Sequence, residues 1–98
     1  MSKEPRDYFE EKSAALINEI KARLEELEYR AETVPWDPDS DERREFDDLR
    51  IRLHDTETLF DELRAAADSA WPALRNEMEQ RLTALSDTVA ARLARVKL

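Results

Sequence analysis

The 98-residue sequence contains no glycine and no cysteine, and its single histidine is His54. Globular domains average about 7% glycine, which supplies positive φ angles at hairpin turns and close backbone approaches. Its absence argues against multi-turn β folds and against the glycine-rich loops that bind phosphates and dinucleotides. The absence of cysteine excludes disulfides, thiolate zinc sites and thiol nucleophiles. One histidine alone also excludes metal sites built from several imidazoles.

Long hydrophobic runs are missing as well. No stretch approaches the roughly 18 apolar residues of a membrane span, and residues 1–5 show no signal-peptide hydrophobic region. We therefore expect a cytoplasmic location. The 24 acidic and 16 basic residues give a net charge of −8, which disfavours nucleic acid as a partner. The charge is uneven, because residues 1–68 carry −10 and residues 69–98 carry +2.

Helical periodicity is what the sequence has in abundance. Between about residues 6 and 33, apolar or small residues recur at spacings of four and three, the heptad pattern of packed helices. Charged pairs four residues apart, such as Glu19 and Arg23, lie off this stripe. Two prolines and an aspartate that can cap a helix predict a turn over residues 34–39. The apolar stripe of this first segment comprises Phe9, Ser13, Leu16, Ile17, Ile20, Leu24, Leu27, Ala31 and Val34.

Two further helices are expected, over about residues 40–67 and 70–97. The stripe of the second has a regular heptad spacing, whereas the third follows an 11-residue period that favours a straighter path. The second stripe comprises Phe46, Leu49, Leu53, Thr56, Phe60, Leu63, Ala67 and Ala70. The third comprises Trp71, Leu74, Met78, Leu82, Leu85, Val89, Leu93 and Val96.

Pro72 decides between two all-α architectures. A proline inside a helix costs about 3 kcal/mol or more, but the first turn tolerates it because those N–H groups have no intrahelical partner. With Ser69 as the N-cap, Pro72 occupies the third position of a new helix. This favours a single domain of three antiparallel segments with coiled-coil-like packing. The alternative is a hairpin whose second helix runs from Ser40 to Val96 with a kink.

Candidate chemical sites have simpler structural explanations. The alternating aspartates Asp37, Asp39 and Asp41 resemble a calcium loop, but Glu42 stands where that loop needs glycine. A turn with a helix cap explains them better. His54 has no nucleophile or orienting group at a spacing that would indicate a catalytic histidine. We therefore predict no catalytic, cofactor-binding or metal-binding residues, no cofactor, and a protein that is not an enzyme.

One segment resembles a known family. Residues 63–71, which end in Ala70 and Trp71, together with Leu74 and Arg75 resemble a segment found in an uncharacterised family of short bacterial coiled-coil proteins. The family repeats an Ala-Trp-x-x-Leu element eleven residues on, where this chain has Leu82 in place of the second tryptophan. Pro72 also departs from the family's usual acidic residue. The resemblance implies a soluble helical protein connected with stress responses, and it carries no catalytic residues.

The expected function is that of a structural or protein–protein interaction module. Its apolar stripes would be buried against partner helices, with charged flanks fixing the register, in a homodimer or with another helical protein. The alternative is binding to a lipid or membrane surface through the basic, amphipathic third helix. The residues expected to form the interface are Trp36, Trp71, Leu74, Met78, Leu82, Leu85, Val89 and Leu93.

Overall fold

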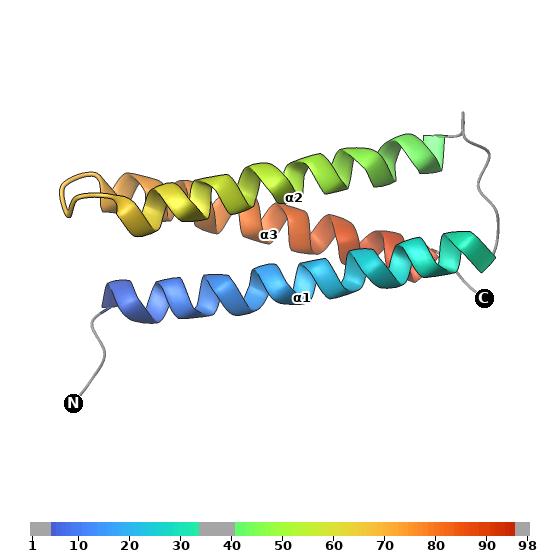
Figure 1. Ribbon diagram of the computed structural model, residues 1–98, viewed down its shortest axis with the longest axis horizontal. Coiled ribbons are helices and arrows are strands. Elements are labelled where there is room, and N and C mark those ends of the chain that lie inside the picture. The colour runs from blue at the N-terminus through green and yellow to red at the C-terminus, as the bar shows by residue number, and fades with distance from the viewer. Residues whose placement is uncertain (1–4, 34–40, 96–98) are drawn as a thin grey trace.

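The computed structural model describes residues 5–33 and 41–95, and they form a three-helix bundle. Helix α1 runs from Pro5 to Thr33, α2 from Asp41 to Ala65 and α3 from Trp71 to Arg95, and the described residues contain no strand. The helices run up, down and up, so that α1 and α3 are parallel and α2 is antiparallel to both (Figure 1). The predicted all-α bundle of three segments is confirmed. The alternative of one long second helix is wrong, because the chain reverses between Ala65 and Trp71.

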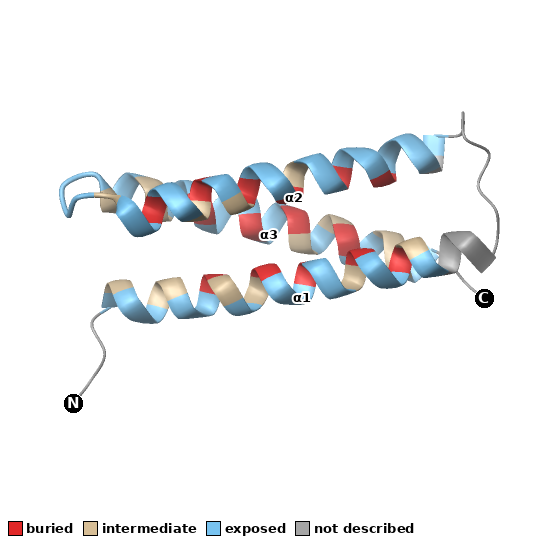
Figure 2. Cartoon of the chain, viewed as in Figure 1, coloured by how far each residue is buried: buried red, intermediate tan, exposed pale blue. Residues whose placement is uncertain are grey.

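The core is built from residues of the predicted stripes, facing inward from all three helices (Figure 2), while the stripe residues Val34 and Val96 lie outside the described residues. The second stripe needs correction, because Leu59 is buried while Phe60 only packs against the edge of the core. Ala67 and Ala70 are also misplaced in that stripe, since both are exposed in the reversal. The buried apolar residues are Ile17, Ile20, Leu24, Leu27, Phe46, Leu49, Leu53, Leu59, Leu63, Met78, Leu82, Leu85 and Val89.

Polar residues within the stripes are accommodated without breaking the helices. Thr56 is 2% exposed, and its hydroxyl donates a hydrogen bond of 2.7 Å to the carbonyl oxygen of Arg52 one turn earlier. This bond satisfies a hydroxyl that would otherwise be buried without a partner. Ser13 is also buried, on α1.

The α2–α3 reversal is made by residues 66–70 without any residue at positive φ in the described chain. The Ala70 N–H donates to the Ala67 carbonyl at 3.0 Å, and the Leu74 N–H donates to the Ala70 carbonyl at 3.4 Å. Ala70 therefore occupies the N-cap position, and Pro72 is the second residue of α3 rather than the third. The prediction that Ser69 caps this helix is wrong by one residue. Pro72 removes only an N–H that has no intrahelical partner.

Arg6 binds backbone carbonyls at the end of α2, of which that of Leu63 also accepts a hydrogen bond from the Ala66 N–H at 3.3 Å. Its guanidinium donates to the carbonyl oxygens of Leu63, Arg64 and Ala66 at 3.2, 3.3 and 2.8 Å. It also contacts the exposed carboxylate of Asp68 at 3.0 Å. Helices commonly end on a glycine in the left-handed conformation, which lets backbone N–H groups bind the last carbonyls. In this glycine-free chain an arginine from another helix makes those hydrogen bonds.

Candidate interaction surface

The residues predicted to form an interface mostly serve the bundle itself. Met78, Leu82, Leu85 and Val89 are at most 4% exposed. Because α1 and α2 cover them, they can meet a second chain only if the bundle opens or exchanges a helix. Their role in self-association stays a prediction. Trp71, Leu74 and Leu93 pack against the core and remain half-buried. Trp36 lies outside the described residues, as do the predicted turn over 34–39 and its aspartates.

An aromatic and arginine cluster closes the end of the bundle where α1 and α3 begin. The rings of Phe9 and Trp71 meet edge to face, with centroids 5.8 Å apart and planes at 87°. The Arg6 guanidinium lies 5.7 Å from the Trp71 ring, and the Arg75 guanidinium lies 5.0 Å from the Phe9 ring. Both arginines are within the range of cation–π attraction. The cluster joins the first turns of two helices that are more than sixty residues apart in sequence.

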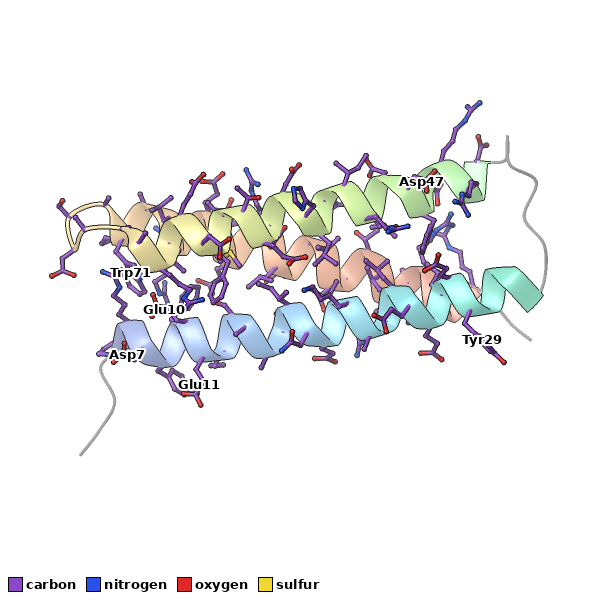
Figure 3. All side chains as sticks on the ribbon, in the orientation of Figure 1. Asp7, Glu10, Glu11, Tyr29, Asp47 and Trp71 are labelled. Atoms are coloured by element: carbon purple, nitrogen blue, oxygen red, sulfur yellow. The ribbon has the colours of Figure 1, made fainter. Side chains whose placement is uncertain are left out.

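Figure 3 shows how this cluster is placed between the helices. Trp71 lies between the start of α1 and the α2–α3 end of the bundle, and Glu10 projects toward it from α1. The carboxylate of Glu10 is 3.7 Å from Arg6. Asp7 and Glu11 instead project from the outer side of α1 (Figure 3). The inner side of the first turns of α1 therefore contributes to the aromatic and arginine cluster, and the outer side is open to solvent.

A groove begins at this cluster and follows α1 and α3 away from their first residues. It has a volume of about 610 Å³. Its floor is largely apolar, and it is bordered by the half-buried rings of Phe9 and Trp71 and by Tyr8, which is 56% exposed. We call this feature the α1/α3 groove. It is lined by Pro5, Tyr8, Phe9, Lys12, Ser13, Ala15, Leu16, Glu19, Trp71, Arg75, Glu79, Leu82 and Thr83.

Sequence reasoning placed Phe9 and Leu16 in the core and did not select Tyr8, Lys12 or Arg75. The heptad stripe shows which face of a helix turns inward. It does not show how far α1 and α3 are rotated relative to each other, and this rotation leaves the edge of the stripe uncovered. The aromatic residue at the start of each stripe gives no such signal either, because the second stripe begins with Phe46, which is buried.

A second groove, of similar volume, lies between the start of α2 and the end of α3. It is lined mainly by charged side chains of both signs, and Arg92 forms an ion pair across it with Glu45. The Arg92 side chain is 13% exposed, whereas its partner Glu45 is 52% exposed. The charged lining residues are Arg44, Arg52, Arg92, Arg95, Glu45, Asp48 and Asp87.

The basic residues of α3 are largely paired with carboxylates. Arg75 lies 3.4 Å from Glu79, and Arg81 lies 2.7 Å from Glu77, both within the same helix. The pair between Arg92 and Glu45 joins the basic α3 to the acidic α2. The other two pairs show that α3 also neutralises much of its charge internally.

The described part of the chain contains no cluster of possible metal ligands. Residues 5–33 and 41–95 bring together no group of three His, Asp or Glu side chains that could hold a metal ion. His54 is exposed on α2, beside Glu57 in a shallow groove against α1. Within the same described residues, no helix is both long and apolar enough to cross a membrane.

Comparison with family models, with curated protein sequences and with solved structures found no match to this chain. The fold and the α1/α3 groove are therefore interpreted from their own physical chemistry.

Proposed function

We propose that this chain is a non-enzymatic helical module that works through protein–protein contact and self-associates. The observation that carries this proposal is the α1/α3 groove, where aromatic side chains collect at the surface of a bundle whose own core is already filled. Aromatic residues and arginine are enriched in protein interfaces, and exposed apolar patches mark contact sites. The resemblance to short bacterial coiled-coil proteins and the expected cytoplasmic location agree with this proposal and stay predictions.

The alternative function, binding to a lipid surface through the third helix, has less support. An interfacial helix inserts its apolar face into the membrane. In α3 that face contains Met78, Leu82, Leu85 and Val89, all of which are buried against the other helices. Lipid binding would therefore require α3 to leave the bundle. The apolar groove requires no such opening, which is why we favour contact between proteins.

Sedimentation equilibrium on the full chain tests this proposal. A small interface associates at micromolar concentrations or above, so the average mass should rise from 11.5 kDa toward twice that value as the protein is concentrated. A mass that stays at 11.5 kDa from about 5 μM to about 1 mM would contradict self-association. A parallel measurement uses anionic vesicles at low salt. Co-sedimentation that disappears at high salt, without any rise in mass in solution, would favour the lipid alternative.

A further inference from the structure

The α1/α3 groove carries opposite charges at its two ends. Lys12 and Arg75 lie toward the start of the helices, next to the aromatic cluster, because Arg75 stacks on Phe9 one turn before Lys12. Glu19 lines the groove further along α1. On α3, Glu79 follows one turn after Arg75 and forms the ion pair of 3.4 Å with it, so these two charges neutralise each other. The α1 side of the groove therefore changes from positive at Lys12 to negative at Glu19 along its length.

We infer that the occupant of this groove is a second copy of the chain, docked antiparallel about a two-fold axis near Ala15. The inference rests on the proposed self-association and adds its location and geometry. A two-fold axis brings each end of a surface onto the opposite end of the same surface in the other copy. Lys12 then faces Glu19 of the partner subunit. A parallel arrangement would place like charges together.

The same axis places apolar surface against apolar surface. Phe9, Leu16 and Trp71 are half-buried in the single chain and lie along the contact. With the axis near Ala15, the two α1 helices overlap over about 22 residues, or about 33 Å. A face of two helices and this length buries on the order of 1,000 Å² in total, which is near the lower limit for specific interfaces. The dimer is therefore expected to dissociate in the micromolar range.

Single cysteines test the geometry, because the chain has none of its own. Ala15 is exposed and lines the groove next to the axis, so the two copies of Ala15→Cys should form an intermolecular disulfide under mild oxidation. A disulfide requires Cα atoms within about 7 Å. The control is Ala22→Cys, which is also exposed and lies one heptad further along the same helix face. Its two copies would be about 20 Å apart and should remain uncrosslinked.

Charge reversal tests the register. Lys12→Glu and Glu19→Lys should each weaken dimerisation about tenfold, because each turns two attractive contacts of the symmetric dimer into repulsive ones. The double variant Lys12→Glu/Glu19→Lys restores opposite charges across the axis and should bring the dissociation constant back to within about threefold of the starting value. Arg50→Glu is the matched control, because it makes the same charge change on an exposed site between α1 and α2. It should leave the dimer unaffected.

The outcomes separate this inference from the function on which it rests. A chain that is monomeric at every concentration contradicts the proposed self-association. A dimer that crosslinks equally through Ala15→Cys and Ala22→Cys, or through neither, contradicts only the antiparallel groove. Failure of the double charge variant to recover binding also overturns the register. Circular dichroism of each variant confirms that the helical bundle is intact.

Discussion

The middle of this bundle and its α2–α3 end are stabilised by different kinds of contact. In the middle, aliphatic side chains from three helices are buried against one another, with Ile20, Met78 and Val89 fully inaccessible. At the end, Arg6 donates hydrogen bonds to three carbonyls and lies against Trp71, while Arg75 lies against Phe9. Burial of aliphatic surface is non-directional. The contacts at the end instead require planar guanidinium groups in fixed positions.

This difference shows where the sequence can vary and where it cannot. The middle depends on volume and apolarity, which several residue types provide. The end depends on the guanidinium group, whose fork of donors reaches several acceptors at once. The absence of glycine explains the second requirement, because the usual left-handed helix ending is not used in the described chain. Three predictions test this contrast.

Truncating a middle residue should have the largest effect. Leu85 is 1% exposed, so Leu85→Ala removes buried methyl groups and leaves a cavity between α3 and its neighbours. We expect the free energy of unfolding to fall by about 3 kcal/mol, measured by urea denaturation followed by circular dichroism. Ile51→Ala, on the outer face of α2 where Ile51 is 61% exposed, is the control and should change stability by less than about 0.5 kcal/mol. Equal losses would mean that α3 does not pack as described.

Removing the Arg6 guanidinium should have an intermediate effect. Arg6→Met removes the donor to the carbonyls of Arg64 and Ala66 and one of the two donors to the Leu63 carbonyl, and should destabilise the protein by about 2 kcal/mol. Arg6→Lys keeps the charge but not the fork, and should lose about half of that. Amide hydrogen exchange should accelerate most in residues 66–74.

The control for Arg6 is another α1 arginine in an exposed pair. Arg23 contacts Glu19 at 2.7 Å, and both side chains are at least one-third exposed. Arg23→Met should therefore cost only a few tenths of a kcal/mol. If Arg23→Met and Arg6→Met were equally destabilising, the role of Arg6 at the reversal would be disproved.

Adding a cap to α3 should have the smallest effect, and it should be stabilising. Ala70 stands at the N-cap without a side-chain acceptor, so Ala70→Ser can accept a hydrogen bond from the N–H of Ala73. The expected gain is about 0.5–1 kcal/mol in thermal or urea unfolding. Ser69→Ala should be nearly neutral. If Ser69→Ala were destabilising and Ala70→Ser were neutral, Ser69 would be the N-cap of α3.

The sequence predicted the helices and most of the core because helical periodicity is a local property. The stripes identified Ile17 through Leu27 on α1 and Met78 through Val89 on α3 as inward positions. The exchange of Leu59 for Phe60 was missed, because each of these residues lies three or four positions from Thr56 and Leu63, so a heptad spacing fits either one. Leu63, in the last turn of α2, is fully buried as predicted.

The aromatic and arginine cluster and the α1/α3 groove could not be predicted, because both depend on how the helices pack against one another. Nothing near Arg6 in the sequence indicates that it binds carbonyls about sixty residues away. The exposure of Phe9 and Trp71 likewise follows from where α3 begins and how it is rotated against α1. A hydrophobic pattern shows which face of each helix turns inward, and only the packed bundle shows which edge of that face is exposed to solvent.

Carbonyls at the end of α2 accept hydrogen bonds from a residue in the first turn of α1. The hydrogen bonds of Arg6 span 57–60 residues, so the reversal between α2 and α3 has its full set of contacts only when α1 is docked. A truncation that removes Arg6 would alter the reversal near Ala66, although the residues of that reversal are unchanged.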